Sequence, residues 1–417
     1  MHNNINLDIK PVSLRLKNQL SSFEESNYID HKVKTFMSKW ELNGTSVAIS
    51  QNGRLVYAKG YGFADLEHSK KVEPSSLFRL ASVSKLITAT GIMKLVENGK
   101  LSLTDKVFGK NAILNDSIFL DFKDKKYKDI CIENLLRHDA GFSSRVRDPL
   151  FIPIYVSEVM GKDAPADSRA CVAFQLRHRL RYKPGTMVVY SNLGYVILSL
   201  VIEKITNMSY EEYIKKNILA PCGVFDMHIA NNFPKDKYKN EVNYYEQDGA
   251  EKIEACDGSG LLVNKCNGGN NVKALSGAGA WIGSAAELIK FVSCIDGEDT
   301  KPDILSKKSI KYMTKKVNGK FPIGWIKVDY KNNWWRTGTL AGSTVLLKKM
   351  DNGISWVMVS NTSSWRGSKF PKAINGLMSR LIRRVEKWPQ HDLFNYFVHK
   401  PIVFNFDEEY TKNNRRT

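Results

Sequence analysis

Ser82 and Lys85 stand three residues apart, at the start of a segment with helical apolar spacing that runs to Asn98. Side chains three apart share one helix face, so the Lys85 ammonium can reach the Ser82 hydroxyl. A serine hydroxyl needs a neighbouring base at neutral pH, and a lysine can serve when burial and nearby positive charge lower its pKa. A backbone N–H at the helix start can also stabilise a developing oxyanion. The pattern indicates nucleophilic acyl transfer, although a serine N-cap followed by a chance lysine would look the same.

Tyr190 and Asn192 form a second candidate pair, which follows the turn Lys183-Pro184-Gly185. A tyrosine held near a lysine can become a phenolate and relay protons to a leaving group. An asparagine amide can orient the lysine and polarise the substrate. The alternative is that Tyr190 is a core aromatic.

A third pattern, Arg336-Thr337-Gly338, falls on an expected strand beside the cleft. A cation there could bind a substrate carboxylate, and a glycine would let a substrate backbone approach the strand closely. The alternative is an exposed strand arginine. The three patterns together are far less likely to arise by chance than any one of them.

The strands that must position these residues are expected at both ends of the chain. Asn52-Gly53 joins two β-rich segments and is the dipeptide that best accepts a type I′ turn. Asp351-Asn352-Gly353 joins a second such pair. The expected strands are Thr45–Gln51, Arg54–Gly60, Gly324–Tyr330, Trp334–Thr337, Thr344–Met350 and Ile354–Ser360.

Helical apolar spacing predominates elsewhere in the chain. Helices are expected over 12–40 with Gly44 as a stop, and over Ser82–Asn98, Tyr195–Ile205, Tyr210–Leu219 and Ser284–Ile295. Ser284 is the expected N-cap of the last helix.

The strand-rich ends must pair with each other to form one sheet, so the middle is most simply an inserted helical region. We therefore expect an α/β (α+β) fold: an antiparallel sheet of about five strands flanked by helices, with an inserted all-helical domain. The expected boundaries are an N-terminal helical segment at 1–43, an α/β domain at 44–108 and 272–386, a helical domain at 109–271 and a C-terminal extension at 387–417. Substrates usually bind in the cleft between two such domains.

The order Ser-x-x-Lys, Tyr-x-Asn, then a basic residue before Thr-Gly resembles that of class C β-lactamases, D,D-peptidases, D-aminopeptidases and related esterases. The surroundings are similar as well, over about residues 40–385. They include Val47–Ser50, Lys59–Gly62, Phe78–Lys85, Leu135–Phe142, Tyr182–Gly185 and the glycine-rich run Gly277–Ala286.

The resemblance implies a β-lactamase/transpeptidase-like fold and a role for each matching residue. Ser82 would be the acylated nucleophile, and Lys85 with Tyr190 the base and proton-relay pair. Asn192 would support that pair. The backbone N–H groups of Ser82 and Thr339 would form the oxyanion hole. No metal or organic cofactor is implied.

The chain departs from the family pattern at two places. Arg336 stands where relatives carry Lys or His, which keeps the positive charge but changes its shape and reach, and this places β-lactam hydrolysis in doubt. Residues 387–417 have no family role, and their aromatic content favours a packed extension over a functional module.

A histidine would be needed for a Ser-His-Asp triad, and His138 lies in the family-like stretch Leu135–Phe142. That stretch is a structural turn in relatives, which favours a structural role for His138. The eight histidines show no metal-ligand spacing. Cys256 and Cys266 flank a glycine-rich loop and could form a disulfide in an exported protein, but unpaired thiols are the favoured interpretation.

The net charge is +19, which favours anionic partners. The basic residues are scattered and no aromatic-interleaved basic motif accompanies them, so a solvated surface is favoured over a nucleic-acid groove. No apolar run reaches the length of about 18 residues that a membrane helix needs. Because the N-terminus lacks an apolar signal core, the protein is either cytoplasmic, or a signal was removed and it belongs to the periplasm or cell envelope.

These observations predict a serine hydrolase that acylates Ser82 and hydrolyses an amide or ester. The expected partner is a small-molecule or peptide substrate, with anionic and cell-wall-derived substrates included. Peptidoglycan D-Ala peptides, β-lactams, D-amino acid peptides and carboxylic esters all remain open. The alternative is a penicillin-binding sensor or scaffold of the same fold that acylates slowly or not at all.

Overall fold

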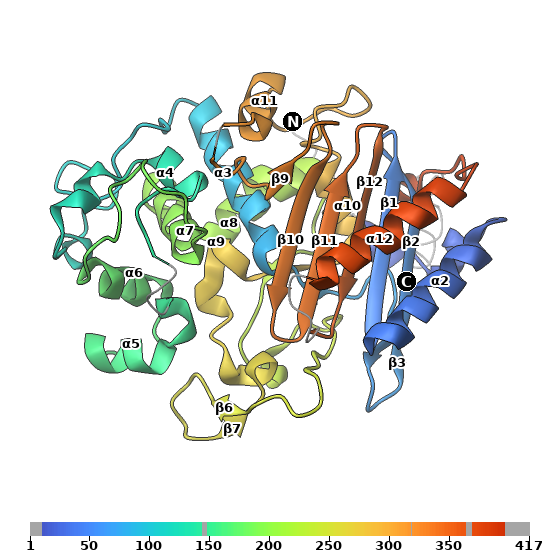
Figure 1. The fold of residues 1–417 in the computed structure, drawn as a ribbon, viewed down its shortest axis with the longest axis horizontal. Coiled ribbons are helices and arrows are strands. Elements are labelled where there is room, and N and C mark those ends of the chain that lie inside the picture. Colours follow the sequence, from blue (N-terminus) through green and yellow to red (C-terminus); the bar gives the residue numbers. More distant parts are fainter. Residues whose placement is uncertain (1–10, 144–147, 318, 364–368, 397–417) are drawn as a thin grey trace, which may run out of the picture.

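A seven-stranded sheet forms the centre of the protein, and its strands follow the order β3-β2-β1-β12-β11-β10-β9 (Figure 1). The computed structural model describes residues 11–143, 148–317, 319–363 and 369–396. The strands are β1 (Gly44–Gln51), β2 (Arg54–Asp65), β3 (Lys70–Lys71), β9 (Lys327–Val328), β10 (Trp334–Leu340), β11 (Ser343–Lys349) and β12 (Ile354–Ser360). Every neighbouring pair is antiparallel. The predicted fold class, with about five long strands, is confirmed, and the two edge strands have two residues each.

The two ends of the chain meet in the middle of this sheet, where β1 pairs with β12 from Thr45↔Ser360 to Gln51↔Ile354. Asn52 and Gly53 have φ values of 49° and 72°, as the predicted type I′ turn requires. The expected strand at Gly324–Tyr330 is shorter than predicted, because only Lys327–Val328 joins the ladder. Gly324 has a φ of 76°, which turns the chain away from an extended path.

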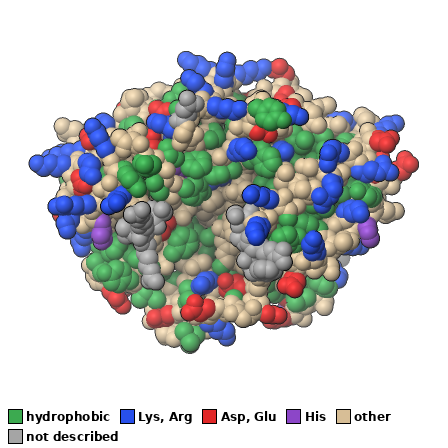
Figure 2. Space-filling model, in the orientation of Figure 1, with side chains coloured by type: hydrophobic (Ala, Val, Ile, Leu, Met, Phe, Trp, Pro, Cys, Tyr) green, Lys and Arg blue, Asp and Glu red, His purple; other side chains and the backbone are tan. Residues whose placement is uncertain are grey.

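The helices of the middle of the chain lie on the β9 and β10 side of the sheet (Figure 1). They are α3 (Ser84–Glu97), α4 (Ile132–Leu136), α5 (Pro153–Met160), α6 (Ser168–Leu176), α7 (Asn192–Thr206), α8 (Tyr210–Ile214) and α9 (Ser276–Gly279). Figure 2 shows a hollow near the centre of this face, between the helical part and the sheet. The proposed domain boundaries stay a prediction.

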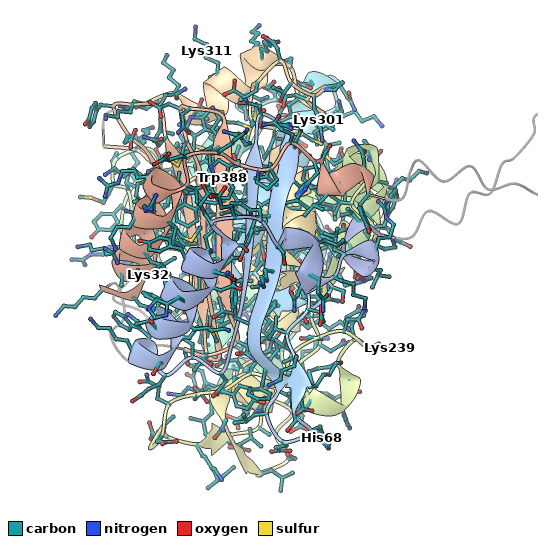
Figure 3. All side chains as sticks on the ribbon, turned by 90° about the vertical axis from the view of Figure 1, so that its right-hand side faces the viewer. Lys32, His68, Lys239, Lys301, Lys311 and Trp388 are labelled. Carbon is teal, nitrogen blue, oxygen red and sulfur yellow. The ribbon has the colours of Figure 1, made fainter. Side chains whose placement is uncertain are left out.

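Helices cover both faces of the sheet. α2 (Ser26–Trp40) and α12 (Lys369–Arg384) lie against one face and α10 (Ala285–Val292) against the other. Figure 3 views the sheet from its β2 edge and shows α2 and α12 together on one side. Ser284 accepts a hydrogen bond from the Glu287 N–H at 3.1 Å, which confirms it as the N-cap of α10.

The expected continuous helix over 12–40 is broken into α1 (Val12–Arg15), a 3₁₀ turn at Asn18–Ser21 and α2. Side chains of that turn bind the edge of β2. The Asn18 Oδ1 accepts from the Gly60 N–H at 2.7 Å, and the Ser21 Oγ accepts from the Ala58 N–H at 2.8 Å. The chain is held along the strand because it satisfies edge groups that would otherwise lack partners. Glu41, with a φ of 54°, ends α2, so Gly44 is not the stop and instead begins β1.

The first part of the C-terminal extension packs on the same scaffold. Trp388 is buried and its ring lies 5.8 Å from that of Phe23. Asp392 accepts a hydrogen bond from the Leu55 N–H of β2 at 2.9 Å. Residues 397–417 lie outside the described part of the chain.

All six cysteines carry free thiols, so Cys256 and Cys266 are not bonded to each other in the structure. Among the described residues, no helix combines the length and the apolar character needed to cross a bilayer.

We expect the side of α12 that packs on the sheet to contribute to the free energy of unfolding through apolar packing. Met378 is fully buried between α12 and the sheet, so Met378→Ala should lower the free energy of unfolding by about 2–5 kcal/mol. Arg380→Ala, on the exposed side of the same helix, should change it by no more than about 0.5 kcal/mol. Urea titration followed by circular dichroism measures both. Equal losses in the two variants would contradict the placement of this face.

Candidate active site

Ser82 lies in a short 3₁₀ turn, Ala81–Val83, between β4 (Phe78–Arg79) and α3. The residue before it, Ala81, has a φ of 48°, a left-handed conformation that an alanine rarely adopts. Ala81 and Val83 are fully buried, whereas Ser82 between them is partly exposed. The expected helix over Ser82–Asn98 therefore begins two residues later, and Ser82 stands on the turn that precedes it.

Strand β10 passes directly beside this turn. The Arg336 Nε donates to the Ser82 carbonyl oxygen at 2.7 Å. A Cβ on Gly338 would lie 2.4 Å from the Leu80 carbonyl oxygen and 3.1 Å from the Ser82 nitrogen. Only glycine fits this position. The backbone that approaches it so closely is that of Leu80 and Ser82, whereas the sequence suggested the backbone of a substrate. Thr337 is half-buried and Thr339 is exposed.

Lys85 is fully buried on α3. Its Nζ donates to the Ser82 Oγ at 3.2 Å, to the Asn192 Oδ1 at 2.9 Å and to the Ala278 carbonyl oxygen at 2.7 Å. Burial lowers the pKa of Lys85, Tyr190 opposes this shift and the Arg336 charge adds to it, and together they bring the pKa to about 8. A lysine with such a pKa can give up its proton near neutral pH.

Tyr190 faces both cations. Its Oη accepts a hydrogen bond from the Arg336 Nη2 at 2.9 Å. Burial by itself would raise the pKa of Tyr190, but the charges of Arg336 and Lys85 outweigh it and bring the pKa down to about 7. The phenol is therefore poised to ionise at neutral pH. Tyr190 is not simply a core aromatic.

Asn192, the first residue of α7, connects Lys85 to a carboxylate that the sequence did not single out. Its Oδ1 accepts from Lys85, and its Nδ2 donates to the Asp148 Oδ2 at 3.1 Å. That contact fixes which end of the amide faces the lysine. Burial raises the pKa of Asp148. The only local signal at Asp148 is the Asp-Pro start of a turn, whose Leu150 N–H it caps.

His138 packs against Tyr190, with the ring centroids 4.3 Å apart. Its Nδ1 accepts a hydrogen bond from the Ser191 N–H at 3.1 Å. Burial, with the charges of Lys85 and Arg336, lowers the pKa of His138 well below its usual range, so the ring stays neutral. In the described residues no hydrogen bond joins His138 to Ser82. The ring supports the tyrosine.

The structure thus brings Ser82, Lys85, Tyr190, Asn192 and Arg336 into one cluster, and their roles in catalysis stay a prediction. The position of Arg336 differs from the expectation, because its side chain is buried and hydrogen-bonded to the protein rather than open to the cleft. Among the described residues, no group of three or more His, Cys, Asp and Glu side chains is placed to hold a metal ion.

Residues 29–376, most of the chain, match the family described as Beta-lactamase. The chain belongs to this family. Protein flp of Staphylococcus aureus (strain N315) is 27% identical over 232 residues, which cover 55% of this chain and 43% of that protein. Penicillin-binding protein 4* of Bacillus subtilis (strain 168) is 30% identical over 203 residues, which cover 48% of this chain and 40% of that protein. The matches therefore span less than half of these relatives' own lengths.

Solved structures confirm the fold. The octameric penicillin-binding protein homologue from Pyrococcus abyssi has a TM-score of 0.63 at 24% identity, over 86% of this chain and 78% of that chain. D-amino acid amidase from Ochrobactrum anthropi SV3 has a TM-score of 0.65 at 21% identity, over 86% and 97%. EstCE1, a hydrolase with promiscuous acyltransferase activity, has a TM-score of 0.64 at 18% identity, over 84% and 97%.

The contact of β10 with the serine turn can be tested at Gly338. Gly338→Ala should push the strand away from Leu80 and slow the reaction of Ser82 with a serine-directed fluorophosphonate by about 10- to 100-fold, because small misplacements of reacting groups have large effects. Gly376→Ala is the control, since the nearest atom to its Cβ is the end of the Arg380 side chain at 3.5 Å. Circular dichroism checks that both variants fold. Equal labelling rates in the two variants would contradict the close contact.

Proposed function

We propose that the protein is a serine hydrolase that forms an acyl-enzyme on Ser82 and then transfers the acyl group to water, cleaving an amide or ester. The observation that carries this proposal is the hydrogen-bonded cluster of Ser82, buried Lys85, Tyr190 and Arg336. Family membership supports it.

In the proposed acylation step, the Ser82 Oγ attacks the substrate carbonyl carbon while its proton passes to the Lys85–Tyr190 pair. The carbonyl oxygen becomes an oxyanion facing the backbone N–H groups of Ser82 and Thr339. The C–N or C–O bond to the leaving group then breaks, and the pair returns the proton to the departing nitrogen or oxygen. In deacylation the same pair takes a proton from the water that attacks the acyl carbon. The bond to the Ser82 Oγ then breaks, the proton passes to that oxygen, and the carboxylic acid is released.

Arg336 acts through Tyr190 in this mechanism. The sequence suggested that it binds a substrate carboxylate, but its Nε and Nη2 already serve Ser82 and Tyr190. A guanidinium stays protonated throughout the working pH range, so it provides a constant positive charge beside the phenol. We therefore assign it to holding Tyr190 in the ionised form.

The cleft and what similar proteins act on support a proposal for the substrate class. One similar structure is a D-amino acid amidase and another is a hydrolase with acyltransferase activity. The cavity beside Tyr190 has a volume of about 780 Å³, which accommodates a compact amide or ester. We propose small amides and esters as substrates. A penicillin-binding sensor would acylate without turnover.

The nucleophile assignment predicts a single labelled residue. A fluorophosphonate probe should modify Ser82, found by peptide mass mapping, and Ser82→Ala should abolish both labelling and p-nitrophenyl ester turnover. Tyr190→Phe should lower kcat by about 100-fold or more with an unchanged circular-dichroism spectrum. Label on another serine, or near-normal kcat in Tyr190→Phe, would refute the assignment. Labelling at Ser82 without turnover would favour the sensor.

The pKa values predict how activity changes with pH. The base must be deprotonated, so kcat/KM should be low in acid and rise with pH to a plateau, with its midpoint between about 7 and 8. Arg336→Gln removes a charge that lowers the pKa of Tyr190, so the rise should move to higher pH by about 1–3 units.

Arg336→Lys is the matched control, because it keeps a positive charge and should retain most of the wild-type profile. A pH–rate profile of each variant on one neutral ester measures the shift. If Arg336→Gln lost activity without any movement of the profile, Arg336 would serve only to hold the strand.

A further inference from the structure

The cavity beside Tyr190 and Asn192 carries a pair of arginines that the catalytic cluster does not use. Phe142, Pro149, Leu180 and Leu193 contribute apolar lining, and Arg179 and Arg181 line the same cavity. Both arginines are exposed, whereas Leu180 between them is buried. The two arginines flank this buried leucine, and both line the cavity.

The segment that carries these arginines is anchored. The Leu180 N–H donates to the Asp124 Oδ2 at 3.2 Å, and the Leu180 carbonyl oxygen accepts from the Lys126 Nζ at 2.9 Å. Both backbone groups of the central residue are therefore held, which fixes where the two flanking side chains leave the chain. The arginines are positioned as a pair by contacts outside the cavity.

Neither guanidinium is neutralised within the part of the chain that the structure describes: no hydrogen bond or ion pair from the side chain of Arg179 or Arg181 to a described residue is present. Asp148 is the one carboxylate among the described residues that line the cavity, and it is bonded to Asn192 and to the Leu150 N–H. The cavity therefore holds two positive charges open to a ligand.

The second cavity next to the cluster, of about 520 Å³, has the same sign of charge. Lys316, Lys320 and Lys327 line it together with Phe321, whose ring lies 6.0 Å from that of Tyr190. Lys320 pairs with Asp139 at 2.7 Å, and no carboxylate lines this cavity among the described residues. Figure 2 shows Lys and Arg side chains on both sides of the hollow. Low-dielectric walls lined by one sign of charge concentrate ligands of the other sign.

We propose that the cavity beside Tyr190 is a specificity site in which Arg179 and Arg181 bind a carboxylate on the substrate, with the apolar lining holding the carbon chain that separates it from the scissile bond. This rests on the proposed hydrolase function and names its substrate class, an amide or ester that carries a second, anionic end. Two guanidinium forks match the oxygens of a carboxylate, which favours this group over a diffuse negative charge.

The test compares two p-nitrophenyl esters of the same chain length, p-nitrophenyl hydrogen adipate and its neutral methyl ester. The measured quantity is the ratio of kcat/KM for the charged ester to that for the neutral one. Wild-type protein should prefer the charged ester. Arg179→Gln and Arg181→Gln should each lower the ratio by about 5- to 20-fold, mainly through KM. This size is expected because the free energy of a charge-assisted contact at a partly exposed site lies between that of a buried pair and that of a surface pair.

Arg177→Gln is the matched control, since Arg177 is exposed in the same segment but does not line the cavity, and its ratio should equal that of the wild type. Raising the salt concentration should lower the wild-type ratio and leave that of the double variant Arg179→Gln/Arg181→Gln nearly constant. A wild-type ratio near one, or equal losses on both esters in the arginine variants, would overturn the specificity site. Absence of turnover on either ester in the wild type, with no label on Ser82, would instead overturn the proposed hydrolase.

Discussion

The site depends on two positive charges that are buried next to one phenol. Lys85 and Arg336 are 0% and 1% exposed, and like charges in such a place repel strongly unless a negative group lies between them. Tyr190 supplies that group when it ionises. Burial, with the Arg336 charge, lowers the pKa of Lys85, and the charges of Arg336 and Lys85 lower the pKa of Tyr190. This electrostatic balance supports the proposed role of Lys85 and Tyr190 as the base that activates Ser82.

Three elements of the fold hold these groups in position. α3 carries Lys85, the turn before it carries Ser82, and β10 carries Arg336 from the other end of the chain. Ser82 and Arg336 are 254 residues apart in sequence, yet a 2.7 Å hydrogen bond joins them. The pairing of β1 with β12 joins strands from the two ends of the chain in one sheet. Gly338 lets the strand approach the turn to the required distance.

The arginines of the cleft divide between two tasks according to their burial. Arg336 is buried and its donors face the protein, so its charge acts on Tyr190. Arg179 and Arg181 are exposed at the cavity and open to a ligand. The proposed contact with an anionic substrate, which the sequence suggested for Arg336, is thus assigned to residues that carry no motif.

Local patterns in the sequence predicted the long strands of the sheet and the residues of the candidate site. Asn52-Gly53 specified its hairpin because few dipeptides accept positive φ at both positions. The Ser-x-x-Lys spacing predicted that Lys85 reaches Ser82, and it does, although Ser82 lies on the turn before α3. The tertiary structure alone decided how Arg336 is used, why the helix expected over 12–40 is broken, and that Asp148 orients Asn192. Each of these depends on a contact between residues far apart in the chain, and hydrogen bonds of that kind leave no periodic signal in a single sequence.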